Sequence, residues 1–409
     1  MNSSSPIGNR DLIRALNRSY VLNMINAFGP IARAEIARRT GLSPATVTGI
    51  TAELISNSLV FEKEAGGSRG GRPPILLAFN PKGGYVIGIK LTDEAATGAL
   101  TDLEATVVAK KRVSLSGRSP EDVVADLADL VFSLLEESQM SAAQLMGVGV
   151  GVAGIVDAGN GLLRQSPIYG WHDVPLSEML QSLVGAPVYV DNDVNTLALT
   201  EKWFGAGQGV DHFLIVTVGR GVGMAIVLNG QLYRGAIGGA GEFGHTVIDP
   251  EGPVCECGKK GCLEAYVGDL GLVRMAQEAA ATGQIGRQVS NVAELLSMAR
   301  SGDPGAQAIF ARAGNYLGLG IANLINLLNP QKILISGEGA SAGDWLFAPM
   351  RDSVLNNVMP GLDQDTEIQI DPWGDDAWAR GAASLVLRKL FESPVHSQTP
   401  QVLETARSV

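Results

Sequence analysis

The sequence predicts a mixed α/β protein in which a small N-terminal winged helix-turn-helix precedes a larger α/β body. Two short helical patterns joined by a glycine-containing turn occur within the first 60 residues, and two β-type segments follow them. From about residue 82 onward, glycine-rich apolar segments of strand character alternate with amphipathic helical patterns, as is typical of α/β layers. The 409 residues are 45% hydrophobic, so the chain can form two or three separate cores.

A first helical pattern occupies residues 18–27. Its apolar residues share one helical face and are Val21, Leu22, Ile25 and Phe28. Gly29-Pro30 ends this helix, because proline has no amide hydrogen to continue the hydrogen-bond ladder.

A helix-turn-helix follows. Residues 34–40 predict a short helix and Gly41-Leu42 a turn; Pro44 then fits the first position of a second helix, which continues to about Ser56. In such a unit the second helix enters the major groove of DNA, where short polar side chains near its N-terminus can contact base edges. The candidates for these contacts are Ser43, which is also a natural N-cap, Ala45, Thr46 and Thr48.

Two β-type segments, 59–62 and 75–79, predict a hairpin that forms the wing. Its tip carries Arg69 and Arg72, which could hold phosphates or enter a narrow minor groove. Residues 1–80 carry a net charge of +4 and the remainder carries −15, within a total of −11. Contact with double-stranded operator DNA is therefore expected at the N-terminus, although some winged helices bind protein instead.

The body begins with strand-like segments after Asn80-Pro81, followed by a long amphipathic helix from Pro120 to Glu137. Later helices are predicted from about Gly268 to Ala281, Val292 to Arg300, Ala306 to Leu328 and Ala377 to Phe391, with a strand at residues 332–336. This alternation of strands and helices predicts two successive α/β units.

The three cysteines lie within eight residues of one another. They are Cys255, Cys257 and Cys262, and His245 precedes the first of them by ten residues. Three thiolates and one imidazole match a closed tetrahedral structural zinc site, and Gly258 and Gly261 supply turns that can wrap the chain around an ion. The alternative is three unligated thiols, with His245 as a hydrogen-bonded core residue.

Two segments, AGEFGH at residues 240–245 and CECGKKGCLE at residues 255–264, resemble the most specific signatures of the ROK family of repressors, open reading frames and sugar kinases. A winged helix followed by this body is similar to the repressors of the Mlc, NagC and xylose-repressor type. The resemblance implies a two-lobed, actin-like and sugar-kinase-like ATPase fold, with zinc bound by His245 and the three cysteines.

The resemblance also implies a sugar pocket. Its hydroxyl-binding residues would be Asn192, Asp193, Glu242, His245 and Glu264. Carboxylates and amides suit this role, because they form paired hydrogen bonds with neighbouring hydroxyls. In the family's kinases the residue that matches Asp193 is the catalytic base, so Asp193 is here a vestigial base or a ligand only. Gly154 and Ser166 are further pocket candidates, and Asp191 is interpreted as a strand-end carboxylate.

The phosphate loops of the family's kinases are altered in this chain. Where those kinases have an Asp-Gly-Gly-Thr loop, residues 87–95 read IGIKLTDEA, with Lys90 in the place of the aspartate and carboxylates that would repel phosphate. In the second loop Arg220 replaces a threonine and Met224 a glycine. An arginine could still attract a phosphate, for example that of a phosphorylated sugar.

The expected function is thus a sugar-responsive DNA-binding repressor, with a monosaccharide or sugar phosphate between the lobes. An ATP-dependent sugar kinase that carries a DNA-binding arm is the alternative. We expect a homodimer or a dimer of dimers in the cytoplasm, without membrane insertion, because no apolar run approaches the length of a membrane span and the N-terminus lacks a signal-peptide core.

The expected division of the chain has four parts. Residues 1–81 form the winged helix-turn-helix and residues 82–194 the first lobe, to which a helix at 377–395 returns. Residues 195–376 form the second lobe with the zinc site and an oligomerisation surface, and residues 396–409 a flexible tail.

Overall fold

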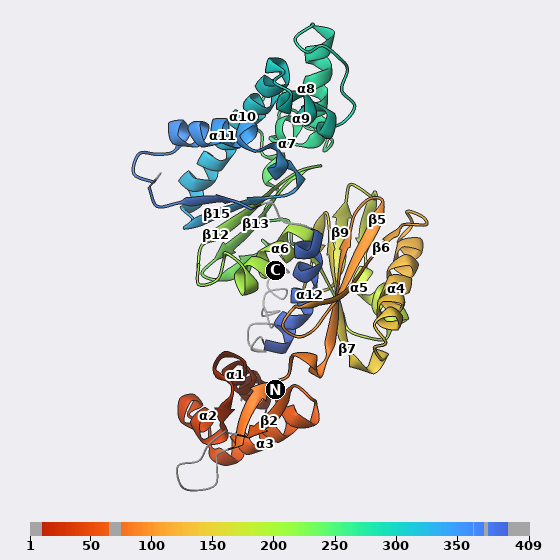
Figure 1. The fold of residues 1–409 in the computed structure, drawn as a ribbon, viewed down its shortest axis with the longest axis vertical. Coiled ribbons are helices and arrows are strands. Elements are labelled where there is room, and N and C mark those ends of the chain that lie inside the picture. The colour runs from red at the N-terminus through yellow and green to blue at the C-terminus, as the bar shows by residue number, and fades with distance from the viewer. Residues whose placement is uncertain (1–9, 65–74, 363, 372–374, 392–409) are drawn as a thin grey trace, which may run out of the picture.

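The computed structural model describes residues 10–64, 75–362, 364–371 and 375–391. A small N-terminal unit lies at one end of the molecule and two larger α/β lobes follow it (Figure 1). The mixed α/β class predicted from the sequence is confirmed.

The N-terminal unit combines three helices with a three-stranded antiparallel sheet. The helices are α1 (Arg10–Phe28), α2 (Arg33–Thr40) and α3 (Pro44–Ser56), and the strands lie in the order β1 (Ile31–Ala32), β3 (Ile75–Phe79), β2 (Val60–Glu64). The sequence predicted the three helices, although α1 begins well before residue 18. Phe28 does not join the buried face of α1. It lies at the end of the helix and is 53% exposed, and the Arg39 guanidinium lies 4.6 Å from the centre of its ring.

The turn between α2 and α3 has the predicted caps. Gly41 ends α2 with φ +72, a left-handed conformation that favours glycine. The Ser43 hydroxyl accepts a hydrogen bond from the Thr46 amide at 3.1 Å, and Pro44 occupies the first turn of α3. These local signals therefore fix where α3 begins.

Some predicted features lie outside the described residues: Arg69 and Arg72 of the wing, residues 392–395 of the last predicted helix, and the tail at 396–409. Among the residues that are described, no helix has the length and apolar character needed to cross a membrane.

The first lobe is built on a five-stranded sheet. Its strand order is β11 (Val188–Asn192), β7 (Leu145–Val152), β4 (Tyr85–Leu91), β5 (Ala95–Thr101), β6 (Val107–Ser114). One face packs against α4 (Pro120–Glu137) and α5 (Leu176–Val184). A small separate sheet has the order β10 (Trp171–Val174), β9 (Leu162–Ser166), β8 (Ile155–Asp157).

The second lobe also contains a five-stranded sheet. Its order is β14 (Gln231–Tyr233), β13 (Val222–Leu228), β12 (Phe213–Val218), β15 (Lys332–Ser336), β16 (Glu367–Ile370). Its main core includes α7 (Glu264–Val267), α8 (Asp269–Ala281), α9 (Val292–Arg300), α10 (Pro304–Leu328) and α11 (Asp344–Asn357). Short 3-10 helices occur at η1 (Pro81–Gly83), η2 (Ala142–Gln144), η3 (Phe243–His245) and η4 (Glu338–Ala342).

Two helices lie between the lobes. Helix α6 (Asp193–Phe204) packs on the second-lobe sheet, and α12 (Asp375–Phe391) packs against α6 and against β4 and β7 of the first lobe (Figure 1). Gly149 of β7 permits this contact, because a Cβ atom there would lie 1.8 Å from the backbone oxygen of Ala382. The last helix of the described residues thus sits at the centre of the molecule (Figure 1).

Candidate functional site

A cleft of about 480 Å³ lies between the two lobes. The parallel strands β4, β7 and β11 end at this cleft, where open α/β sheets commonly bind ligands. The second lobe contributes the β12–β13 turn and residues near η3 and η4. The side chains predicted to bind sugar all line it: Asn192, Asp193, Glu242, His245 and Glu264.

Asn192 is the N-cap of α6, which limits what it can offer a ligand. Its Oδ1 accepts hydrogen bonds from the amides of Val194 at 2.9 Å and Asn195 at 3.3 Å, and its Nδ2 donates to the oxygen of Gly154 at 3.1 Å. One amide hydrogen of Asn192 is left for a ligand. Gly154, predicted as a pocket residue, also lines the cleft, and its φ of +134 favours glycine.

Ser166, the other pocket candidate, is fully buried and is not among the residues that line the cleft. Its hydroxyl donates to the backbone oxygen of Ala153 at 2.9 Å. The prediction that Ser166 belongs to the pocket is therefore wrong: this serine supports the cleft wall from behind.

Asp193 is the first residue of α6, directly at the cleft. Burial raises the pKa of its carboxyl, while the Lys90 ammonium offsets part of this rise and Glu338 adds to it. A carboxyl group with a raised pKa is a stronger hydrogen-bond acceptor and base than an ordinary aspartate. This chemistry suits contact with a sugar hydroxyl.

Glu242 and Glu264 approach the cleft from the second lobe. Removal from water raises the pKa of Glu242; His245 lowers it, and the carboxylates of Glu264 and Asp193 raise it further. Glu264 begins α7, and its Oε2 accepts a hydrogen bond from the amide of Val222 at 3.0 Å. Three carboxyl groups thus converge on one cleft.

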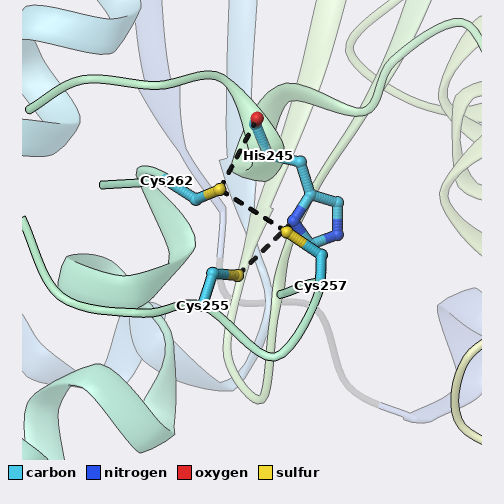
Figure 2. A group of neighbouring side chains, drawn as sticks. All are labelled: His245, Cys255, Cys257 and Cys262. Carbon is cyan, nitrogen blue, oxygen red and sulfur yellow. Dashed lines mark hydrogen bonds between the residues drawn. The ribbon is translucent and has the colours of Figure 1, made fainter. Parts of the chain in front are cut away.

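The predicted metal ligands form one cluster, which Figure 2 shows. The ligand atoms of His245, Cys255, Cys257 and Cys262 all lie within 4.8 Å of one another. Cys255 Sγ is 3.6 Å from His245 Nδ1, and Cys257 Sγ is 3.6 Å from Cys262 Sγ. Adjacent sulfurs of a tetrahedral zinc site lie roughly 3.8 Å apart, so this donor set could hold a metal ion such as zinc.

The loop around the cysteines is shaped by its glycines. The amide of Gly258 donates to the Cys255 oxygen at 2.9 Å, and its φ is +83. Gly261 has φ +71, and a Cβ atom there would lie 1.6 Å from the Asp249 oxygen. Burial raises the pKa of Cys255 to about 12, so this buried sulfur would stay a neutral thiol unless a cation lay beside it.

His245 joins the cluster to the cleft. Its Nδ1 faces Cys255 Sγ, whereas its Nε2 lies 3.9 Å from Glu242 Oε2. A metal on Nδ1 would leave the proton on Nε2, pointed at the cleft. One imidazole can therefore serve both predicted roles, as a metal ligand and as a donor to a hydroxyl.

Residues 86–389 match the profile of the ROK family. This chain belongs to the ROK family. The ROK relatives include the xylose repressor of Bacillus subtilis, 32% identical over 381 residues that cover 93% of this chain and 97% of the relative. The DNA-binding transcriptional dual regulator NagC of Escherichia coli is 33% identical over 353 residues, or 86% of this chain and 87% of NagC.

Solved ROK structures share the fold. A ROK family transcriptional regulator described as a homolog of the E. coli MLC protein superposes with a TM-score of 0.84 and 29% identity, covering 94% of this chain and 98% of that protein. A ROK family glucokinase from Streptomyces griseus, in complex with glucose and AMPPNP, superposes with a TM-score of 0.65 and 30% identity, covering 74% of this chain and 99% of the glucokinase.

In this ROK protein the segments that contain Lys90 and Arg220 carry charges that pair with carboxylates at the cleft. The Lys90 ammonium lies 3.9 Å from the centre of the Trp378 ring and 3.9 Å from Glu338 Oε1. The Arg220 guanidinium lies 3.7 Å from Asp93 and 3.5 Å from Glu256. Lys90 and Arg220 thus both have protein partners. Sequence reasoning missed Trp378 and Glu338, since each comes from a distant part of the chain.

The predicted DNA contacts lie at the start of α3. Thr48 donates its hydroxyl to the oxygen of Pro44 at 2.8 Å, and Ser43 and Thr46 share a hydrogen bond at 2.8 Å. Ser43, Ala45 and Thr48 are exposed, and Thr46 is half-buried. This end of the helix therefore presents small polar side chains and one methyl group to solvent.

Proposed function

We propose that this chain is a sugar-responsive transcriptional repressor of carbohydrate-utilisation genes. The observation that carries this proposal is the convergence of three carboxyl groups, one amide and one imidazole on one cleft. The N-terminal unit adds two short helices, α2 and α3, joined by a left-handed turn at Gly41. Full-length similarity to the xylose repressor and to an MLC homolog supports both the sugar-binding and the DNA-binding part of the proposal. The effector is a monosaccharide or sugar phosphate bound by Asn192, Asp193, Glu242, His245 and Glu264.

In this proposal the N-terminal unit, residues 1–81, binds operator DNA as a winged helix. The start of α3 enters the major groove, with base-edge contacts from Ser43, Ala45, Thr46 and Thr48, and Arg69 and Arg72 of the wing hold the backbone. The protein acts in the cytoplasm as a homodimer or a dimer of dimers, because paired half-sites require paired winged helices. The second lobe, residues 195–376, supplies the oligomerisation surface.

We further propose a structural zinc ion at His245, Cys255, Cys257 and Cys262. Such an ion would cross-link η3 to the cysteine loop. Because all four of its ligands would come from the protein, it would have no open coordination position for a catalytic water. The role of the chain's own residues is to fix the orientation of His245, and with it the proton that Nε2 presents to the cleft.

The alternative is an active ATP-dependent sugar kinase with a DNA-binding arm. Asp193 at the cleft and the similarity to a glucokinase favour it. Phosphoryl transfer depends on groups that hold and neutralise the phosphates of ATP. Here Asp93 and Glu94 line that side of the cleft, and Lys90 and Arg220 already pair with carboxylates. We therefore favour the sensor over the kinase.

The first experiment is thermal unfolding of the zinc-loaded protein with D-xylose, D-glucose, their phosphate esters and, in parallel, Mg-ATP. A ligand that binds only the native state raises Tm. We expect a shift with one sugar and none with ATP, and a Glu242→Gln variant should lose the sugar shift. A shift with ATP together with sugar-dependent ADP formation would establish the kinase instead.

The second experiment is a titration of DNA from the region upstream of the protein's own gene, with and without that sugar. Tight, salt-sensitive binding that the sugar weakens is the expected result. A Thr48→Ala variant, altered at the start of α3, should bind the operator more weakly but respond to sugar as before. Absence of salt-sensitive DNA binding would instead favour a winged helix that recruits protein.

A further inference from the structure

The loop at residues 234–242 carries Glu242 to the cleft and contacts both lobes on its way. It leaves the second lobe at the end of β14, and a Cβ atom on Gly241 would lie 2.1 Å from the oxygen of Met224 in β13. On the other side, a Cβ atom on Gly238 would lie 1.9 Å from the oxygen of Val156 in β8 of the first lobe. The loop is thus held tightly between the lobes.

Arg234, at the start of this loop, forms an ion pair with the fully buried Asp191 of the first lobe, while its own side chain is 21% exposed. Its Nε and Nη2 donate to Asp191 Oδ2 at 2.9 and 2.6 Å, and the Asp191 side chain has no exposed surface. The other oxygen, Oδ1, accepts from the Asn192 amide at 2.8 Å and from Asn195 Nδ2 at 3.0 Å. The carboxylate therefore has four donors, which is its full capacity.

The pair connects the two halves of the polar site without lining it. Asp191 directly precedes Asn192 and Asp193, whereas the loop that begins with Arg234 ends at Glu242. Neither Asp191 nor Arg234 is among the residues that line the cleft. Together with the Arg234 oxygen, which accepts from the Ala240 amide at 3.1 Å, the pair fixes both ends of the loop.

We propose that Asp191 and Arg234 are positioning residues that set the distance between Glu242 and Asp193 and so preorganise the cleft for a polyhydroxylated ligand. This inference rests on the proposed function. Preorganisation raises affinity, because the loop then loses little freedom when ligand binds. An ion pair that takes a carboxylate out of water adds little net stability over an uncharged pair of the same shape. The position of this pair beside the site therefore points to geometry rather than to stability.

The test compares the wild type with a double variant, Asp191→Asn with Arg234→Met. Removal of both charges avoids leaving one of them buried and unpaired, and asparagine Oδ1 can still accept from Asn192 and Asn195. In the ligand-free protein, hydrogen exchange of amides 235–242 should become roughly tenfold faster. The affinity for whichever of D-xylose, D-glucose or their phosphates binds the wild type should fall roughly tenfold or more.

The matched control is Lys332→Met with Glu367→Gln. It removes a 3.2 Å ion pair between the first residues of β15 and β16, which do not line the cleft. This control should keep wild-type exchange and affinity. The double variant should keep wild-type zinc content and, without sugar, wild-type operator affinity. These two measurements check that its fold is intact.

The outcomes separate the inference from the proposed function. Wild-type exchange in residues 235–242, or wild-type sugar affinity in the double variant, would overturn the positioning role and leave the repressor proposal standing. Failure of the wild type to bind any of the sugars would overturn the proposed function and the inference with it, whatever the exchange rates show.

Discussion

In the proposed function His245 is both a metal ligand and a sugar contact. Its Nδ1 faces the cysteine sulfurs, and its Nε2 faces Glu242 in the cleft. The orientation of the imidazole ring therefore depends on the cluster. The direction in which its remaining N–H points depends on which ring nitrogen the cluster uses. Loss of a metal ion from the cluster should therefore weaken sugar binding through His245.

Cys257→Ser tests this dependence. We expect the purified variant to lose its zinc, to unfold at a lower temperature and to bind sugar more weakly, because three donors hold zinc poorly and His245 loses its anchor. Metal analysis, thermal unfolding and sugar titration measure the three effects. Glu251→Gln, at a nearby exposed position that does not line the cleft, should change none of them. A stable, zinc-free Cys257→Ser protein with a normal sugar response would contradict the role of the cluster.

Asp193→Asn should stabilise the protein while weakening sugar binding. Because the folded pKa of Asp193 is raised, the charged carboxylate is disfavoured in the folded state, and wild-type stability falls as pH rises from the unfolded pKa through the folded one. The variant lacks this loss, so its Tm should exceed that of the wild type by about 1–3 °C at pH 7. The difference should shrink toward pH 4.

The same variant loses a charged acceptor at the cleft. Its sugar affinity at pH 7 should fall about 10- to 100-fold, the usual effect of removing one charge-assisted hydrogen bond. Differential scanning calorimetry between pH 4 and pH 8, together with sugar titration, measures both effects. A Tm below that of the wild type at pH 7 would show that Asp193 is a stabilising group and not a strained functional one.

At the scale of elements, local patterns predicted most helices. The bounds of α4 and α9 agree with their apolar periodicity, and the caps of α2 and α3 agree with Gly41 and Ser43. Partners distant in the sequence were not accessible in this way. Asp191 has the sequence context of an ordinary strand-end carboxylate, and only the fold brings Arg234 to it. Contacts between elements, unlike turns and caps, leave no periodic signal in the chain.

Two glycines near α3 should respond in opposite ways to alanine. A Cβ atom added at Gly41 or at Gly49 would meet nothing within 4 Å. The two alanine substitutions therefore do not differ in steric clashes with neighbouring residues. Gly41 has φ +72, and Gly41→Ala should destabilise the N-terminal unit by about 1 kcal/mol. Gly49 lies inside α3, where Gly49→Ala should stabilise it by about 0.5–1 kcal/mol.

Hydrogen exchange of the α3 amides in the full chain measures both changes, and each variant serves as the control for the other. Equal effects of the two substitutions would mean that the left-handed turn at Gly41 does not limit the stability of this unit.

At the scale of the whole molecule, α12 connects the cleft with the N-terminal unit. Trp378 near its start lines the cleft beneath Lys90. At its other end the ring of Phe391 lies 5.7 Å from that of Phe79 in β3. Its apolar residues share a core cluster with α1 and α3, so one helix spans the distance between the proposed sugar site and the proposed DNA-binding unit.

Two hydrogen bonds hold the far end of this helix. The Ser19 hydroxyl and Asn23 Nδ2 of α1 both donate to the backbone oxygen of Phe391, at 2.8 and 2.7 Å. Phe391 is the last described residue of α12, so these two bonds join α1 to that end of the helix. Replacing both donors with Ser19→Ala and Asn23→Ala should remove about 1 kcal/mol per bond from the joint while leaving the cleft intact.

The coupling between sugar and operator should therefore weaken in this double variant. We expect unchanged sugar affinity and a ratio of operator Kd values, with and without sugar, that falls several-fold toward 1, because movement of α12 no longer transmits fully to α1. Parallel titrations of sugar and operator measure the ratio, with Ser56→Ala as a control that removes an exposed hydroxyl from the same unit. An unchanged ratio would mean that the signal reaches the N-terminal unit by a path other than the joint between α1 and α12.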